Sequence, residues 1–209
     1  MQYGVTMFMT DRTIGPAALA RAVEERGLHS LYIPEHTHIP VSRRTPPPTG
    51  DAELKDEYKR TLDPLVALAV AAGVTERILL GTGIALIAQR EPIVTAKAIA
   101  TLDRESQGRF VLGIGFGWNE DELEDHGFSM PQRRDVTRER MLAMRELWTQ
   151  DVAEFHGEYV DLAPSWSWPK PYGAPERPGP PVLIGGARSE EHTSELQSLA
   201  YLVCRLLLE

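Results

Sequence analysis

Short apolar runs and longer segments with helical spacing alternate along the first 187 residues of the chain. The short runs have the length of buried strands, and the longer segments repeat their apolar residues every three to four positions. The expected strands are Tyr3–Phe8, Leu31–Pro34, Ile78–Ile84, Phe110–Ile114 and Pro181–Ile184, and the expected helices are Thr13–Val23, Leu62–Gly73, Pro92–Glu105 and Gln132–Trp148. Regular alternation of strand and helix predicts an α/β fold, with a parallel sheet and helices outside it.

The number of expected strands limits the architecture. An α/β barrel and a doubly wound sheet are both built from such units, and a barrel needs eight of them in about 250 residues. The chain has 209 residues and five expected strands, so we expect one α/β domain truncated after about five strands. A small hairpin is expected near Gly157. The long polar loop from His36 to about Arg60 has the length typical of functional or mobile loops.

Composition and charge narrow the possible partners. The chain is 42% hydrophobic and 25% charged, and its formal net charge is -8. An acidic chain lacks the basic face that nonspecific nucleic-acid binding needs, so we expect no nucleic-acid partner. No stretch approaches the roughly 20 apolar residues of a membrane span, and no secretory signal is visible. The single cysteine, Cys204, excludes an internal disulfide, and we expect a cytoplasmic protein.

The last 22 residues, 188–209, differ in kind from the rest of the chain. The stretch from Arg188 to Ser198 closely resembles the in-frame translation of a common sequencing-library adapter. The other interpretation is a native helix with Ser189 as its N-cap and apolar residues such as Leu196 and Leu199. We favour the first interpretation, so we expect residues 1–187 to form the domain and residues 188–209 to be a non-native tail.

Candidate chemical groups follow the carboxyl ends of the expected strands, where both α/β architectures bind their ligands. The segment Pro34-Glu35-His36-Thr37-His38 comes directly after the second strand. One carboxylate and two imidazoles suit proton transfer or hydrogen bonding to a polar cofactor ring, because histidine titrates near neutral pH. Metal binding is an alternative, but no fourth ligand is evident and we expect no metal. A hydrogen-bonded structural turn is the other alternative.

Glycine-rich turns follow three other strands. The segment Gly81-Thr82-Gly83-Ile84 ends the third strand, where missing side chains let the backbone approach a flat ligand. The segment from Gly113 to Glu120 follows the fourth strand, but Trp118 stands where a dinucleotide fingerprint has its third glycine. Gly185-Gly186 follows the fifth strand and would open a phosphate-binding turn. Each turn is a weak signal when it is taken alone.

Taken in chain order, these segments resemble the luciferase-like monooxygenase superfamily, and within it the deazaflavin-dependent oxidoreductases. The resemblance is carried by residues 31–40 (LYIPEHTHIP), 80–84 (LGTGI), 102–109 (LDRESQGR), 113–120 (GIGFGWNE), 146–148 (ELW) and 181–186 (PVLIGG). The joint order of these segments is far more specific than any single motif. The resemblance implies a (β/α)8 TIM barrel, and the chain is similar to its first five strands.

The resemblance also implies a cofactor site. In the family, the cofactor lies across the strand carboxyl ends on a backbone bulge that often contains a non-proline cis peptide, which corresponds here to Gly83-Ile84. The family's ring-contacting histidine matches His36, which together with Glu35 is the expected catalytic pair. The residues expected to bind the cofactor are His36, Thr82, Gly83, Ile84, Gly115, Phe116, Gly117, Trp118 and Asn119.

Three hypotheses about function follow from the resemblance. The first is hydride transfer between coenzyme F-420 and a small organic substrate, because a deazaflavin passes hydride and does not activate oxygen. The second is an FMN-dependent monooxygenase. The third is a fragment without catalytic activity, because an open part of a barrel exposes two sheet edges. Homodimers are common in the family, so the full-length protein could form one.

Two further details bear on the substrate and the cofactor. Family members that oxidise sugar phosphates carry a catalytic glutamate where this chain has Phe116, which argues against that reaction and indicates an apolar substrate wall. The basic residues of the long loop could meet the anionic tail of F-420, and an ordinary solvated loop is the alternative. These residues are Arg43, Arg44, Lys55, Lys59 and Arg60.

Overall fold

The computed structural model describes residues 2–41, 43–46 and 53–185. Its main feature is a five-stranded parallel sheet with the strand order β1-β2-β3-β4-β7. The strands are β1 (Gly4–Thr6), β2 (Ser30–Ile33), β3 (Leu79–Thr82), β4 (Phe110–Ile114) and β7 (Val182–Ile184). The predicted α/β class, with a parallel sheet of five strands, is therefore confirmed.

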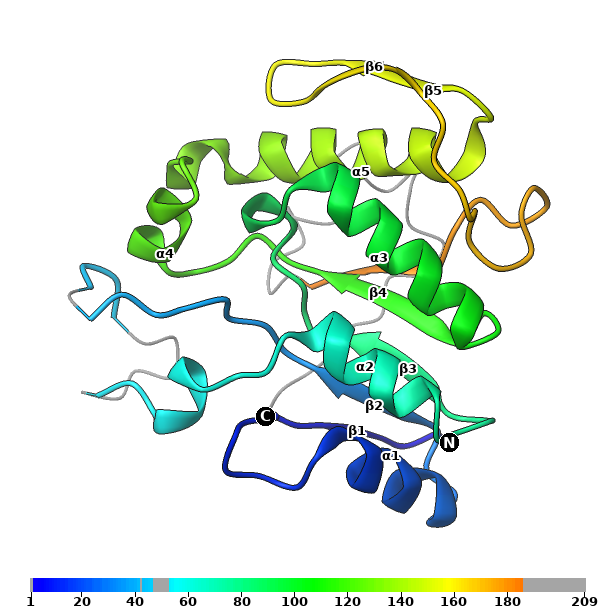
Figure 1. The fold of residues 1–209 in the computed structure, drawn as a ribbon. Helices are drawn as coiled ribbons and strands as arrows, with labels where there is room; N and C mark the ends of the chain where they lie inside the picture. The colour runs from blue at the N-terminus through cyan, green and yellow to red at the C-terminus, as the bar shows by residue number, and fades with distance from the viewer. Residues whose placement is uncertain (1, 42, 47–52, 186–209) are drawn as a thin grey trace.

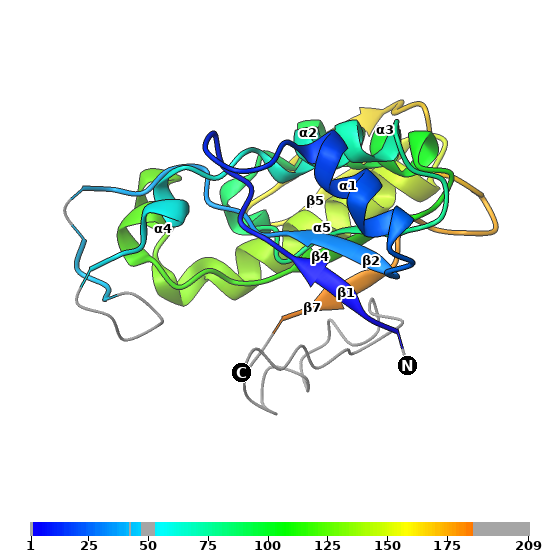
Figure 2. The same cartoon turned by 90° about the horizontal axis from the view of Figure 1, so that it is seen from below.

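The main helices follow the strands in chain order (Figure 1). They are α1 (Pro16–Glu25), α2 (Pro64–Ala72), α3 (Pro92–Glu105) and α5 (Arg133–Thr149). Figure 2 shows α1, α2 and α3 side by side over one face of the sheet. These three helices begin with proline, which suits the first turn because its missing N–H would have no helical partner there. Asp63 caps α2 by accepting a hydrogen bond from the Val66 N–H at 3.0 Å.

The core lies between the sheet and these helices. All five residues of β4 are buried, as is typical of a parallel strand with an apolar environment on both faces. Leu31, Leu80 and Phe110 on neighbouring strands are fully buried, in one cluster with Leu68 of α2 and Ile99 of α3. Burial of each such side chain contributes about 1.5–3 kcal/mol. Apolar contact between the two layers therefore holds the described fold together.

A close contact between β2 and β3 depends on glycine. The Tyr32 ring lies over Gly81, and a Cβ atom at position 81 would come within 2.3 Å of that ring. The carbonyl oxygen of Val111 would lie 3.0 Å from the same atom. Glycine is therefore the residue that fits at position 81 while tyrosine occupies position 32.

Between α5 and β7 the chain leaves the sheet. There β5 (Ala153–His156) and β6 (Asp161–Ser165) form an antiparallel pair, which confirms the predicted hairpin. The pair lies above α5 in Figure 1. The buried Lys170 ammonium donates to the carbonyl oxygen of Leu147 at 2.9 Å and also to that of Gln150. It thereby satisfies carbonyl groups that the end of α5 leaves without a helical partner.

Some parts of the fold differ from the sequence prediction or fall outside the described residues. The pattern does not reveal α4 (Glu120–Asp125), because the helix has six residues and one large apolar side chain. It also does not reveal the short helices η1 (Asp56–Lys59), η2 (Ile87–Gln89) and η3 (Met130–Gln132). The expected tail, residues 188–209, and the turn residue Gly186 lie outside the described residues. In the described part of the chain, no helix has the length and apolar character to cross a membrane.

Arg109 closes the amino end of the sheet. Its guanidinium donates to the carbonyl oxygens of Ala72 at 3.2 Å, Thr75 at 2.9 Å and Ile78 at 3.2 Å. Burial lowers the pKa of Arg109, and the nearby Glu24 partly offsets this effect. The guanidinium therefore ties the end of α2 to the start of β3 through main-chain groups.

Glu24 also bonds main-chain groups at the amino end of the sheet. Its carboxylate accepts hydrogen bonds from the N–H groups of residues 76–78 at 2.7–3.2 Å. Burial by itself raises the pKa of Glu24, but these donors and Arg77 outweigh it, so the pKa lies below its usual value. A cavity of about 320 Å³ opens beside Glu24 and is also lined by His29 and Arg77.

Candidate active site

The segments that follow the parallel strands meet at the carboxyl end of the sheet. In Figure 1 this end lies to the left, where the loop after β2 and the helix α4 project from the sheet. The site residues expected after β2, β3 and β4 therefore share one edge. Their contacts decide which of them can act together.

An aromatic cluster surrounds His36 at this edge. The ring centroid of His36 lies 5.3 Å from that of Tyr58 and 5.9 Å from that of Trp118. Phe8, with its centroid 4.8 Å from that of Tyr58, extends the cluster to the end of β1. The sequence indicated His36 and Trp118, whereas Phe8 and Tyr58 belong to no motif. The cluster places flat apolar side chains beside an imidazole.

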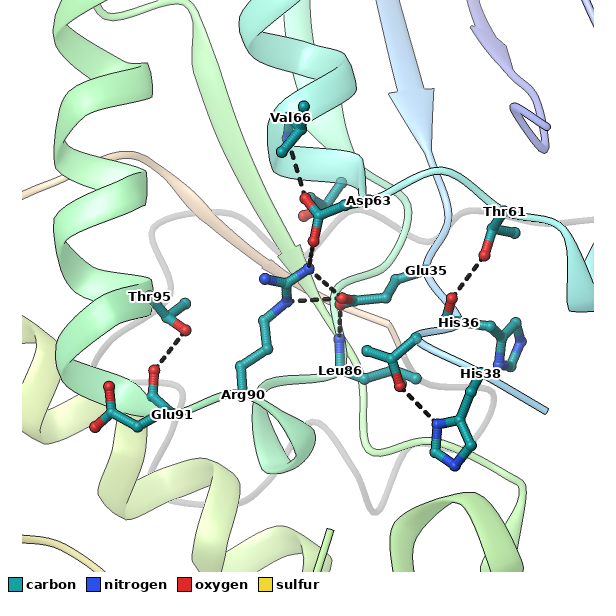
Figure 3. Close-up of polar contacts among 12 residues, drawn as sticks. Glu35, His36, His38, Thr61, Asp63, Val66, Leu86, Arg90, Glu91 and Thr95 are labelled. Carbon is teal, nitrogen blue, oxygen red and sulfur yellow. Dashed lines mark hydrogen bonds and ion pairs between the residues drawn. The ribbon is translucent and has the colours of Figure 1, made fainter. Parts of the chain in front are cut away.

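His36 is held by a carboxylate from α4. Its Nδ1 lies 2.9 and 3.1 Å from the two oxygens of Glu122, and the side chains are 7% and 1% exposed. The Thr61 hydroxyl donates to the His36 carbonyl oxygen at 2.7 Å, which fixes the backbone (Figure 3). Among the described residues, no hydrogen bond reaches the Nε2 of His36. This nitrogen is therefore available to a ligand.

Glu35, the neighbour of His36, points to the other side (Figure 3). Its carboxylate accepts from the Leu86 N–H at 2.7 Å and from the Arg90 Nε–H at 2.7 Å. Arg90 also donates to Asp63 at 2.7 Å. Burial alone lowers the pKa of Arg90, but the two carboxylates raise it above its usual value. Since neighbouring residues of an extended chain face opposite sides, Glu35 anchors the segment after β3 and does not support His36 as expected.

The predicted backbone bulge after β3 is present. The peptide bond between Gly83 and Ile84 is cis, as the resemblance implied. The Gly83 N–H donates to β2 at 2.8 Å and the Ala85 N–H donates to Gly113 of β4 at 2.7 Å, so both neighbouring strands hold the bulge. The Thr82 hydroxyl donates to the Gly113 carbonyl oxygen at 2.6 Å. This hydroxyl is used inside the sheet, and its contact with a cofactor stays a prediction.

The turn after β4 leads from Gly115 into α4. Gly117 has a φ of 75°, a conformation that favours glycine, and the chain changes direction there. Phe116 is half-buried, and the Arg134 guanidinium lies 5.5 Å from its ring centroid. The turn thus presents Phe116 and Trp118, the latter to the aromatic cluster.

Asn119 ends this turn with an unpaired amide. Its side chain is buried, and neither Nδ2 nor Oδ1 has a hydrogen-bond partner within residues 2–41, 43–46 and 53–185. Asn119 occupies the N-cap position of α4 but makes no capping bond. Such a buried unpaired group costs about 1–3 kcal/mol, and native proteins contain few of them. The amide is therefore a candidate for contact with a polar ligand.

The second histidine of the segment, His38, does not join His36. Its Nε2 lies 2.9 Å from Asp125, and its Nδ1 lies 3.0 Å from the hydroxyl of Thr37, which also reaches His126 at 3.1 Å. Burial lowers the pKa of His126, and the nearby His38 adds to that effect. Within the described ranges, no group of three or more histidine, cysteine or acidic side chains is arranged to hold a metal ion.

Most basic residues of the long loop already have acidic partners. Arg44 pairs with Asp121 and Glu124, Lys59 with Asp56, and Arg60 with Asp11 and Asp56. Arg43 differs, because its buried Nε lacks a hydrogen-bond partner among the described residues. A role in binding an anionic cofactor tail stays a prediction, and Arg43 is now its best candidate.

Comparison with known proteins adds sequence relatives. A family model described as luciferase-like monooxygenase matches residues 16–196. An uncharacterised protein of Mycobacterium tuberculosis is 52% identical over 194 residues, which cover 92% of this chain and 67% of that protein. An F-420-dependent glucose-6-phosphate dehydrogenase of Amycolatopsis mediterranei is 34% identical over 116 residues, which cover 54% of this chain and 34% of that enzyme.

Solved structures share the fold. A monooxygenase from Streptomyces bottropensis matches with a TM-score of 0.74 and 27% identity, over 91% of this chain and 55% of that one. The oxygenating constituent of a diketocamphane monooxygenase from Pseudomonas putida, solved with FMN, matches with a TM-score of 0.70 and 20% identity. The match covers 89% of this chain and 51% of that one. The chain spans about half the length of these structures, which agrees with a truncated barrel. It belongs to the luciferase-like monooxygenase family, a family of oxidoreductases.

Proposed function

We propose that the chain provides the cofactor site of an oxidoreductase that exchanges hydride between coenzyme F-420 and a small organic substrate. The observation that carries the proposal is the pair of polar groups without a hydrogen-bond partner among the described residues at the carboxyl end of the sheet, His36 Nε2 and the Asn119 amide. They follow β2 and β4, on either side of the bulge after β3. The Amycolatopsis relative, named as F-420-dependent, supports the choice of cofactor.

The residues at this edge fit a flat, polar ring. At the bulge, Gly83 offers backbone without a side chain, and Trp118 offers an apolar ring beside His36. His36 and Asn119 offer hydrogen-bonding atoms that no described residue uses. When bound, F-420 would supply the carbon centre that accepts or donates the hydride.

The protein's own part is to position groups and to control one proton. His36 would hydrogen-bond the ring or hold a proton at Nε2 beside the reacting centre. Its side chain is 7% exposed, so the imidazole stays within the site. The aromatic cluster places apolar rings beside the imidazole, and a less polar surrounding strengthens electrostatic contacts.

The substrate class follows from Phe116. This half-buried side chain stands where the resemblance places the catalytic glutamate of sugar-phosphate oxidisers. An apolar wall there favours a substrate with an apolar face and offers no carboxylate for proton removal. We therefore do not propose for this chain the glucose-6-phosphate activity that names the Amycolatopsis relative.

Titration of the full chain with F-420 and with FMN tests the proposal. We expect F-420 to bind at least about tenfold more tightly, a difference of about 1.4 kcal/mol, as measured by cofactor fluorescence. His36→Ala should weaken F-420 binding about tenfold, because it removes a hydrogen-bonding group and part of the cluster. The matched control is His29→Ala, at the amino end of the same strand, which should change nothing. Equal losses of F-420 affinity in His36→Ala and His29→Ala would exclude His36 from the cofactor site.

Arg43 tests the recognition of the anionic tail. Arg43→Ala should weaken F-420 more than FMN, because F-420 carries the additional negative charge. Arg44→Ala is the control, since its guanidinium already pairs with Asp121 and Glu124. Equal losses for the two cofactors in Arg43→Ala would exclude a tail-binding role.

An FMN-dependent monooxygenase is the second candidate, and the FMN complex of the diketocamphane enzyme favours it. It predicts tighter binding of FMN and oxygen consumption with reduced FMN and substrate. Binding of neither cofactor would leave the third hypothesis, a chain inactive by itself. That outcome would accord with coverage of 67% of the mycobacterial relative.

A further inference from the structure

A second feature of the site concerns the carboxylate behind His36. The Glu122 side chain is 1% exposed, and among the described residues its oxygens have one hydrogen-bond partner, His36 Nδ1. A buried ionised carboxylate needs a donor, and a proton on Nδ1 would supply it at this distance. The proton that remains to be exchanged is then the one at Nε2.

The helix that carries Glu122 is held by other contacts as well. Arg44 donates to Asp121 from its backbone N–H at 2.7 Å and from Nε at 2.9 Å, and it also pairs with Glu124. His38 lies 2.9 Å from Asp125. These contacts tie α4 to the segment after β2 without any help from Glu122.

We infer that Glu122 is the positioning residue of His36: it accepts the Nδ1 proton, fixes the ring orientation and makes Nε2 the working nitrogen. A carboxylate that orients an imidazole through one nitrogen and so defines the other is a recurring arrangement in proteins. The inference rests on the proposed function only where it assigns Nε2 to the ligand. The placement of the Nδ1 proton belongs to the protein alone and is measurable without cofactor.

The direct test is the tautomer of His36 in the full chain without cofactor. Long-range ¹H–¹⁵N spectra of histidine-labelled protein distinguish a protonated Nδ1 from an unprotonated one, and His36→Ala identifies the signal. At about pH 8, where exposed imidazoles are neutral, we expect Nδ1 of His36 to carry a proton. In Glu122→Gln the amide both donates and accepts, so this preference should weaken. The matched control is Glu120→Gln, on the same helix and with the same charge change, and it should keep the wild-type tautomer.

Catalysis gives a second readout once a substrate is known. Glu122→Gln should lower kcat at least about tenfold and leave the cofactor Kd within about threefold, because the imidazole and the aromatic cluster remain in the site while the proton at Nε2 is no longer held in place. A wild-type His36 that is unprotonated at Nδ1 would overturn the inference, whether or not the variant folds. An unchanged tautomer in Glu122→Gln would also overturn it.

The two proposals fail separately. Suppose that F-420 does not bind, that Nδ1 of His36 carries the proton in the wild type, and that this preference weakens in Glu122→Gln. The inference about Glu122 then stands and the proposed function fails. If F-420 binds and turns over while Glu122→Gln keeps the wild-type tautomer and kcat, the inference fails alone.

Discussion

Two pairs of polar residues at opposite ends of the sheet make different kinds of contact. At the amino end, Arg109 and Glu24 direct their hydrogen bonds to carbonyl and N–H groups of the main chain. At the carboxyl end, His36 pairs with one distant side chain, and Asn119 has no partner in the part of the chain that the structure describes. The difference distinguishes groups that stabilise the fold from groups that the proposed function assigns to a ligand.

The physical reason is the cost of a buried polar group. A group whose partners lie in the same fold contributes to stability at all times, whereas an unpaired buried group lowers stability until a ligand binds. In α/β barrels the amino end of the strands serves stability and the carboxyl end serves chemistry. Substitutions at the two ends should therefore change different measurable quantities.

The largest effect is expected from Arg109→Ala. The carbonyl oxygens of Ala72, Thr75 and Ile78 lose their donor, so the free energy of unfolding should fall by about 3–4 kcal/mol. Urea unfolding followed by circular dichroism measures this change. Arg104→Ala, on the exposed side of α3, is the control and should stay within about 0.5 kcal/mol of wild type.

The affinity for cofactor should not change in the folded fraction of Arg109→Ala. If the cofactor affinity of Arg109→Ala fell by as many kcal/mol as its free energy of unfolding, the two ends of the sheet would be coupled and not independent.

Asn119→Leu should separate stability from binding. The substitution removes a buried amide without described partners, so the free energy of unfolding should rise by about 1 kcal/mol. Cofactor affinity should fall about tenfold, because the ligand loses its polar contact. Thermal unfolding and cofactor titration of the same sample measure both quantities. A loss of stability would indicate that the amide already has a structural partner.

The smallest effect is a change in pH dependence at Glu24. Its folded pKa lies below the usual value, so its contribution to stability is present above the unfolded pKa of about 4.3 and is lost as pH falls through the folded pKa. Glu24→Gln should therefore flatten the fall of the unfolding midpoint in that acidic range. The control is Glu25→Gln, an exposed neighbour on α1. An equal flattening in both variants would show that overall charge, and not the three N–H contacts, is responsible.

Local signals explain which elements the sequence predicted well. The expected bounds of α3 (Pro92–Glu105) and β4 (Phe110–Ile114) are those observed. A proline at the start of a helix and an unbroken apolar run are both visible within a few residues. By contrast, α4 is too short to show a helical period, so the element that carries Glu122 could not be predicted.

Long-range partners explain what the sequence could not provide at the site. The pattern indicated His36, but its partner Glu122 lies 86 positions away. Arg90, the partner of Glu35, lies 55 positions away. The sequence contains both Glu35 and Glu122, but it does not show which of the two carboxylates faces His36 in space. Adjacent position along the chain favoured Glu35, whereas the alternation of side chains turns Glu35 away from His36.

The contact between Tyr32 and Gly81 has a consequence for how this sequence can change over time. A side chain at position 81 collides with the tyrosine ring, so any single replacement there is blocked while position 32 is unchanged. Replacing Tyr32 by a smaller residue removes the ring from that space and leaves the Val111 carbonyl oxygen, at 3.0 Å, as the next nearest contact of an alanine at position 81. Relatives should therefore vary at these two positions as a pair, with the change on β2 preceding the change on β3.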